Sequence, residues 1–144
     1  MKLTTRTHYG IRAMLELAEN YGHGPLQIKI IGKRQDISVK YLEQLMATLK
    51  SGGLIRSIRG SKGGYTLTKA PVDVRLREIF NCLEGPIVTI ECVEDESFCA
   101  RAADCAIREL WSRVQDAMMS VLQSMTLQDL VSKSKETKNL DYQI

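Results

Sequence analysis

Three of the four cysteines lie in one short segment of the chain, at Cys92, Cys99 and Cys105. Six residues separate the first pair and five the second, so the paired Cys-x-x-Cys knuckles that are typical of structural zinc sites are absent. Thiols in the cytoplasm are normally reduced, which disfavours a disulfide framework. Three thiolates on one loop are instead suited to an iron–sulfur cluster, provided that a fourth ligand comes from elsewhere in the molecule.

The residues around these cysteines leave the metal open. Four acidic residues crowd the same segment, namely Glu91, Glu94, Asp95 and Glu96. Negative charge beside anionic thiolates favours a harder cation, unless the carboxylates are simply solvated loop surface. Zinc and an unligated thiol switch are therefore alternatives to the cluster. The fourth cysteine, Cys82, lies beside an apolar helix position and is expected to be a small packed residue.

The elements that must position these residues follow from the apolar periodicity. Helical spacing of apolar side chains predicts helices over 5–20, 28–34, 39–50, 73–83 and 106–125. A capping box at 126–129 predicts one last short helix, with Leu127, Leu130 and Val131 inside. Thr4 or Thr5 is expected to cap the first helix. The β-branched and aromatic runs 54–58 and 65–68 flank a glycine-rich turn and predict a hairpin. The fold class is therefore mainly α with a small β-hairpin.

The charge of the chain is divided between its two halves. Residues 1–70 carry 12 Lys and Arg against 4 Asp and Glu, whereas residues 71–144 carry 8 against 13. The halves therefore have net charges of +8 and −5, which is typical of a polyanion-binding module joined to a part with another function. Helix, short helix, turn, helix and basic hairpin is also the order of a winged helix-turn-helix. The alternative is a solvated basic face on an ordinary α+β domain.

The helix over 39–50 is the candidate recognition helix. Its apolar positions face the core, which leaves the opposite face for the major groove, with Ser38, Lys40, Tyr41, Glu43, Gln44 and Thr48. At the hairpin tip, Arg59 and Lys62 suit the phosphates or the minor groove. Further phosphate contacts are expected from four more cations, Lys2, Arg6, Lys33 and Arg34.

Three stretches of the chain resemble the Rrf2 superfamily of bacterial winged-helix regulators, whose types include IscR, NsrR and CymR. They are MKLTTRTHYGIRAMLELA, ISVKYLEQLMATLKSGGLI and SIRGSKGGYTLTKAP, and the likeness extends through LWSRVQDAMMSVLQSMTLQDLV, to about residue 131. The resemblance implies a homodimeric DNA-binding repressor with a winged helix-turn-helix and a long C-terminal dimerisation helix over 106–125. A dimer with two recognition helices implies an imperfect palindromic operator on double-stranded DNA.

The resemblance also implies particular site residues. DNA contacts would fall on Ser38, Lys40, Tyr41, Glu43 and Gln44 of the recognition helix, and on Arg59, Ser61, Lys62 and Gly63 of the wing. Members of the family that bind a cluster carry three cysteines in this loop, typically five residues apart. Cys92, Cys99 and Cys105 would then hold an iron–sulfur cluster of the two-iron type, with one extra residue in the first interval.

The fourth cluster ligand is the position at which this chain departs from the family. The IscR type has a histidine three residues after the last cysteine, where this chain has Arg108, a permanently charged side chain with no free lone pair. In the NsrR type, a residue near the N-terminus of the other protomer completes the site, and the matching position here is His8. His8 of the partner subunit is therefore the candidate ligand. A helix-start histidine that faces water or phosphate is the alternative.

The chain is expected to divide into five parts: a winged-helix DNA-binding domain over 1–71, a connecting helix over 72–86, a cysteine-containing sensor loop over 87–105, a dimerisation helix with a short terminal helix over 106–131, and a loose polar tail over 132–144. A cluster-free regulator that responds to a protein partner, as in the CymR type, is the second function considered. No catalytic constellation is present, so an enzyme is not expected. No run is long and apolar enough for a membrane span or a signal peptide, and a cytoplasmic location is expected.

Overall fold

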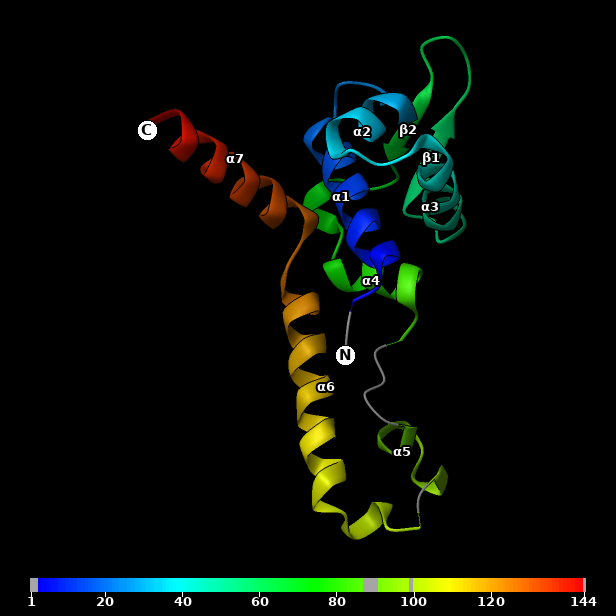
Figure 1. Ribbon diagram of the computed structural model, residues 1–144, viewed down its shortest axis with the longest axis vertical. Coiled ribbons are helices and arrows are strands. Elements are labelled where there is room, and N and C mark those ends of the chain that lie inside the picture. The colour runs from blue at the N-terminus through cyan, green and yellow to red at the C-terminus, as the bar shows by residue number, and fades with distance from the viewer. Residues whose placement is uncertain (1–2, 87–90, 99, 144) are drawn as a thin grey trace.

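The computed structural model describes residues 3–86, 91–98 and 100–143, and it confirms a mainly helical chain with one small hairpin (Figure 1). The helices are α1 (Thr5–Glu19), α2 (Ile28–Gln35), α3 (Val39–Ser51), α4 (Leu76–Glu84), α5 (Glu91–Glu94), α6 (Ala106–Ser124) and α7 (Leu127–Gln143). The strands are β1 (Ile55–Ile58) and β2 (Gly64–Leu67). The helix α4 begins three residues later than expected, because Pro71–Asp73 forms a separate 3-10 turn.

Two helices begin at hydroxyl residues that cap them. The side chain of Thr4 accepts a hydrogen bond from the amide of Thr7 at 3.3 Å, so Thr4 and not Thr5 caps α1. The Ser38 Oγ accepts a hydrogen bond from the amide of Tyr41 at 3.2 Å. Each cap satisfies a backbone donor that has no partner within the helix. Ser38 therefore defines where α3 begins.

The turn between α2 and α3 is tight. Asp36 adopts a left-handed conformation with φ of 54°, which ends α2. The amide of Ile37 then donates to the carbonyl of Gly32 at 3.0 Å. A Cβ atom on Gly32 would lie 2.8 Å from the carbonyl oxygen of Ile37, so this close approach requires glycine. The turn fixes how α3 crosses α2.

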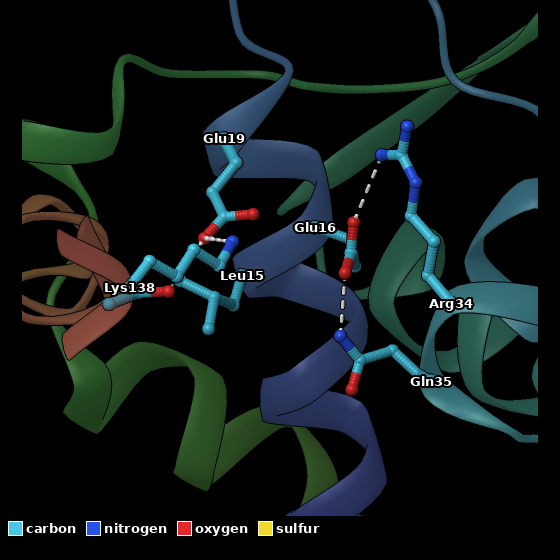
Figure 2. Close-up of a pocket in the computed structure, with 7 residues that line it drawn as sticks. Leu15, Glu16, Glu19, Arg34, Gln35 and Lys138 are labelled. Atoms are coloured by element: carbon cyan, nitrogen blue, oxygen red, sulfur yellow. Dashed lines mark hydrogen bonds and ion pairs between the residues drawn. The ribbon is translucent and has the colours of Figure 1, made fainter. Parts of the chain in front are cut away.

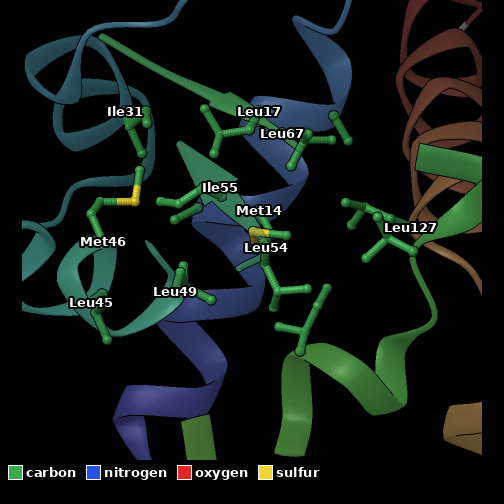
Figure 3. Packing of buried hydrophobic residues seen from close by; sticks show 14 of the residues in the cluster. Met14, Leu17, Ile31, Leu45, Met46, Leu49, Leu54, Ile55, Leu67 and Leu127 are labelled. Carbon is green, nitrogen blue, oxygen red and sulfur yellow. The ribbon is translucent and has the colours of Figure 1, made fainter. Parts of the chain in front are cut away.

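The hydrophobic core joins the first three helices, the hairpin, α4 and the start of α7. Figure 3 shows Met14 of α1 near Leu49 of α3, while Ile31 of α2 lies near Met46 of α3. All four side chains have no solvent-exposed area, and burial of each contributes roughly 1.5–3 kcal/mol to stability. Leu127 at the start of α7 is equally buried, which makes the C-terminal helix part of the same core.

The hairpin is attached to the body by backbone pairing at the outer edge of β2. Strands β1 and β2 are antiparallel, with Ile55 opposite Leu67 and Ile58 opposite Gly64. The outer edge of β2 pairs with the segment before α2, since Leu26 and Tyr65 exchange two backbone hydrogen bonds of 2.9 Å. A Cβ atom on Gly64 would overlap the carbonyl of Leu26, so glycine is needed for this pairing. The hairpin is thereby held beside α3.

The end of α4 is tied to the start of α1 through one carboxylate. Glu84 accepts hydrogen bonds from the hydroxyls of Thr4 and Thr7, the latter at 2.5 Å. The hydroxyl of Thr4, followed by that of Thr7, lowers the pKa of Glu84 below its ordinary value of 4.5. A carboxylate whose pKa is depressed in the folded state stabilises that state above its unfolded pKa.

This contribution of Glu84 should be lost in acid. We expect the stability difference between the wild type and Glu84→Gln to be present at neutral pH and to vanish as the pH falls through the lowered pKa. Urea unfolding at a series of pH values measures the difference. Glu136→Gln, an exposed change on α7, is the control. If the difference in unfolding free energy between the wild type and Glu84→Gln does not change with pH, the charge of Glu84 is not its cause.

The helix α6 runs away from the body formed by α1–α4 and the hairpin, and α5 lies beside its far part (Figure 1). Along its 19 residues Gln115 is buried, whereas large apolar side chains are exposed, namely Ile107, Leu110, Trp111 and Val121. The predicted helix is confirmed. Leu122 and Met125 at its end pack against the core, whereas these four apolar side chains remain exposed in a single chain. The cysteine segment, expected to be a loop, contains α5 and short 3-10 turns at Glu96–Phe98 and Ala102–Asp104.

The prediction of a loose polar tail after Ser132 is wrong, because α7 continues to Gln143. Its middle turns pack on α1 through polar contacts. The hydroxyl of Ser134 donates to Glu19 at 3.0 Å, and Lys138 lies 3.6 Å from the same carboxylate. These contacts supplement the buried start of the helix, so the short helix expected before residue 132 is longer by more than two turns.

Candidate nucleic-acid interface and cysteine segment

The outward face of α3 carries the polar residues that the sequence assigned to it. Leu42, Leu45, Met46 and Leu49 are buried. On the opposite face Lys40, Glu43 and Gln44 are exposed. The helix thus presents a cation, a carboxylate and an amide to solvent, which are groups that contact phosphates and base edges. The Ser38 side chain is exposed as well, although its hydroxyl oxygen already caps the helix.

Tyr41 differs from this pattern because it is half-buried. Its ring meets the edge of Tyr9 on α1, with ring centres 6.1 Å apart. The guanidinium of Arg12 lies 5.5 Å from the centre of the Tyr9 ring and also donates to the side chain of Gln35 at 2.7 Å. The Tyr41 ring therefore links the recognition helix to α1, which leaves its hydroxyl as the part suited to an outside contact.

Two cations expected on phosphate are engaged inside the chain. Arg6 donates to the hydroxyl of Thr48 on α3 at 3.0 Å. Arg34 lies 3.3 Å from the carboxylate of Glu16 on α1. Lys33 is exposed, whereas Lys2 lies outside the described residues. The contacts of Arg6 and Arg34 position α2 and α3 against α1, a role that the sequence did not indicate.

The hairpin tip places two cations beside α3. Arg59, Ser61 and Lys62 are exposed, and Figure 1 shows the hairpin next to α3 with its loop projecting beyond the body. Gly63 is buried within the hairpin, where a Cβ atom would overlap the carbonyl of Ile58. Gly63 therefore permits the tight turn, and the side chains of Arg59 and Lys62 supply its positive charge.

The cysteine segment is held to α6 by polar contacts. Gln115 of α6 donates to the carboxylate of Glu94 at 2.5 Å. Arg108, near the start of α6, donates to the carbonyl of Val93 at 3.4 Å and lies 3.5 Å from the carboxylate of Glu96. These contacts bring the beginning of the segment, at α5, next to its end. Arg108 therefore holds the cysteine segment against α6.

The cysteines are described to different extents. Cys105 precedes α6 as its N-cap residue and has a free, half-buried thiol. The backbone of Cys92 lies in α5, while its side chain and the whole of Cys99 lie outside the described residues. In the described part of the chain, no three His, Cys, Asp or Glu side chains are grouped as they would be around a metal. His8 is an exposed residue of α1, with its ring 5.7 Å from that of Tyr9.

The donor set of this segment fits an iron–sulfur cluster in part. Thiolates are the usual ligands of such clusters, and the contact between Arg108 and Val93 draws the residue that follows Cys92 toward the helix that follows Cys105. Arg108 itself does not fit, because a guanidinium has no lone pair to donate. Arg108 therefore does not supply the fourth ligand that three thiolates require.

Cys82 is a packed residue, as expected. Its thiol is half-buried on α4 and donates to the carbonyl of Thr48 at 3.4 Å. Burial raises the pKa of this thiol, so it stays protonated and poorly reactive at neutral pH. Cys82 is thus separate in chemistry from the cysteines of the 92–105 segment.

A basic hairpin beside an exposed recognition helix defines the class of winged helix-turn-helix regulators. Residues 3–133 match the Rrf2 family, described as iron-dependent transcriptional regulators. The chain belongs to the Rrf2 family of transcriptional regulators. Among the described helices, none is long and apolar enough to span a membrane.

Three comparisons place the chain within this family. It is 44% identical over 132 residues to the helix-turn-helix-type transcriptional regulator CymR of Bacillus subtilis, covering 92% of this chain and 91% of that protein. The solved structure of CymR, described as the global cysteine regulator of B. subtilis, has a TM-score of 0.79 at 42% identity, covering 92% and 98%. The structure of T. potens IscR has a TM-score of 0.79 at 35% identity, covering 95% and 90%.

Proposed function

We propose that this protein is a homodimeric repressor that binds an imperfect palindrome in double-stranded DNA and acts in the cytoplasm. The observation that carries the proposal is the exposed polar face of α3 beside the cationic tip of the hairpin. An exposed helix of this size fits the major groove, and an arginine on a narrow loop suits the negative potential of the minor groove. The two elements together would cover one half-site.

The proposed DNA contacts are of two kinds: contacts with phosphates position the protein, and contacts with base edges read the sequence. The residues that we assign to DNA are Lys2, Ser38, Lys40, Tyr41, Glu43, Gln44, Arg59, Ser61, Lys62 and Gly63. Lys40 and Lys62 would contact phosphates, and Glu43 can accept a hydrogen bond from the amino group of cytosine. Gly63 is buried and would contribute by allowing the tight turn that presents Arg59 and Lys62. Specificity then depends on Glu43 and Gln44, and affinity on the cations.

The dimer would be built on α6. Its exposed apolar side chains continue into an apolar groove of about 390 Å³ between α1, α4 and α6, lined in part by Ile11, Phe80, Met118 and Val121. A single chain that leaves such a surface open to water gains stability by pairing it with a second copy. Pairing through a twofold axis would set the spacing of the two recognition helices.

The cysteine segment is proposed as the sensor. Cys92, Cys99 and Cys105 would hold a two-iron cluster, with His8 of the partner subunit as the fourth ligand. The likeness to T. potens IscR and the description of the family as iron-dependent support this assignment. Such a cluster supplies an oxygen- and redox-sensitive link between its ligands. The chain's part would be to supply three thiolates, one of them from Cys105 directly before α6.

A cluster-free regulator is the second candidate, in which the signal is a protein partner, zinc or thiol oxidation. Two observations favour it. The identity to CymR, a cysteine regulator, is higher than that to T. potens IscR. Gln115 and Arg108 of α6 also hold the segment directly, through contacts with Glu94, Val93 and Glu96. If the signal is a protein partner, replacement of Cys92, Cys99 and Cys105 should leave regulation intact, whereas a zinc or thiol-oxidation signal should be lost with these cysteines.

Anaerobic purification from iron-replete cells separates the two candidates. We expect a coloured protein with visible absorbance, whose affinity for a DNA duplex selected from a random library changes when the iron is removed. Cys105→Ala should be colourless, whereas Cys82→Ala, the matched control outside the segment, should keep the colour. Colourless wild-type protein that binds equally well with and without iron would disprove the cluster.

His8 is tested with the same preparation. If His8 of the partner subunit is a ligand, His8→Cys should keep a cluster whose spectrum changes because a thiolate replaces imidazole on the iron. Its reduction potential should also fall, because a thiolate lowers the potential relative to imidazole. His8→Ala should lose the native spectrum. A native spectrum in His8→Ala would remove His8 from the ligand set and leave the three cysteines to be judged by Cys105→Ala.

A further inference from the structure

A polar cleft of about 390 Å³ lies between α1, α2 and α7, on the body of the protein and not on the cysteine segment (Figure 2). It is lined by Leu15, Glu16, Glu19, Arg34, Gln35, Ser134 and Lys138. Its size is in the range of sites for small molecules. The charges that line it include two carboxylates and two cations, so the cleft is charged but balanced.

The carboxylates form the inner part of the cleft and the cations its rim. The side chain of Glu16 is 8% exposed and receives Arg34 at 3.3 Å and Gln35 at 2.6 Å. The side chain of Glu19 is 21% exposed, and its Oε1 atom receives both Ser134 at 3.0 Å and Lys138 at 3.6 Å. Arg34 and Lys138 are 56% and 63% exposed, so these flexible cations can turn toward a ligand.

We propose that this cleft binds a small zwitterion of the α-amino acid class. The ammonium group would lie against the carboxylates of Glu16 and Glu19, and the ligand carboxylate would contact Arg34 and Lys138 at the rim. A zwitterion can replace the internal ion pairs charge for charge. A ligand with only one charge would leave a carboxylate or a cation of the cleft without compensation, which is unfavourable at a partly buried site.

Ligand binding in this cleft would affect the position of α3 through the end of α2. Arg34 and Gln35 are the last residues of α2, and the left-handed Asp36 follows directly before the turn into α3. A ligand that takes over the partners of Arg34 changes what holds α2 to α1. We therefore expect occupancy of the cleft to alter DNA affinity, through a route that does not involve the cysteines.

Ligand binding is tested first without DNA. Thermal unfolding is followed with each common L-α-amino acid, and hits are titrated calorimetrically. We expect at least one amino acid to raise the unfolding midpoint, since a ligand that binds only the folded state stabilises it. Its N-acetyl and amide derivatives, each lacking one charge, should not. The proposal fails if no amino acid raises the midpoint or if the single-charge derivatives do so equally.

Lys138→Ala locates the site. This exposed residue is chosen because Arg34 was also expected to contact phosphate, so its replacement would act in two ways. We expect about fivefold weaker amino acid binding, the loss of one partly exposed ion pair. Lys135→Ala, an exposed lysine of the same helix outside the cleft, should bind as the wild type does. Equal affinities for the two variants would place the ligand elsewhere.

The regulatory step has its own measurement. Operator affinity of a variant lacking Cys92, Cys99 and Cys105 is compared with and without the amino acid found by titration. A change confirms that the cleft acts on α3 independently of the cysteine segment. An unchanged affinity overturns the regulatory step, and because binding is measured without DNA, it leaves the proposed repressor function to be judged separately.

Discussion

Removing both cations of the wing, in the double variant Arg59→Ala and Lys62→Ala, is expected to weaken operator binding at least about a hundredfold at low salt. Both side chains are exposed at the hairpin tip and lie beyond the body of the protein. The dimer would lose four cationic contacts with the DNA. Counterion release then falls, so the dependence of binding on salt should become shallower by about three to four units in the log–log slope.

Fluorescence anisotropy over a salt series measures both quantities. The control is Lys133→Ala with Lys135→Ala, which removes the same charge from α7, away from the hairpin. This control should lose little affinity, because net charge alone acts weakly at a distance in salt. If the two double variants lose affinity equally, the wing does not contact DNA and the effect is one of overall charge.

The second large effect is expected from Val121→Glu on α6. Val121 is 57% exposed in the single chain and lines the apolar groove beside Met118 and Phe80. A carboxylate there would be buried twice in a symmetric dimer, and each buried unpaired charge costs several kcal/mol. The variant should be a folded monomer. Operator affinity should fall by about two orders of magnitude or more, since each half-site is then bound alone.

Analytical ultracentrifugation gives the oligomeric state, and circular dichroism shows that the chain is still folded. Gln123→Glu, an exposed change on the same helix, introduces the same charge and should remain dimeric. A Val121→Glu protein that stays dimeric would mean that α6 does not form the interface. In that case the exposed stripe of α6 requires another partner, and the spacing of the recognition helices is set elsewhere.

The recognition helix and the hairpin were predictable because their signals are local. Leu42, Leu45, Met46 and Leu49 recur at helical spacing, and Ser38 is a cap residue directly before them. The turn chemistry of the hairpin is equally local, with glycines between two strand-like runs. Each such pattern concerns neighbours in the chain, so no knowledge of distant contacts is needed.

The tie between Glu16 and the end of α2 was not predicted. Glu16 is buried on the core side of α1 beside Met14 and Leu17, and a charge at that place in an apolar face is the signal that could have revealed it. Its partners Arg34 and Gln35 lie about twenty residues away, and Arg34 was expected to contact phosphate instead. Pairing across that separation depends on how α1 and α2 cross.

The length of the C-terminal helix was also not predicted, because it depends on contacts between residues that are distant in the sequence. The polar composition of 132–144 carries no apolar period, so propensity alone favoured a loose tail. The structure extends α7 to Gln143, with Leu127 in the core and Ser134 and Lys138 on Glu19 of α1. A helix of modest propensity becomes stable when its first turn is anchored by burial and later turns gain contacts.

By itself the sequence determined the element order, the separation of a basic half from an acidic half, and the kinds of side chain that could contact DNA or bind a metal. Only the tertiary structure decided which of those side chains are free. Arg59 and Lys62 remain exposed, whereas Arg6, Arg34 and Arg108 are engaged within the chain. The physical reason is that a charged side chain is satisfied by whichever opposite charge or acceptor the fold brings within reach, and that partner is usually distant in sequence.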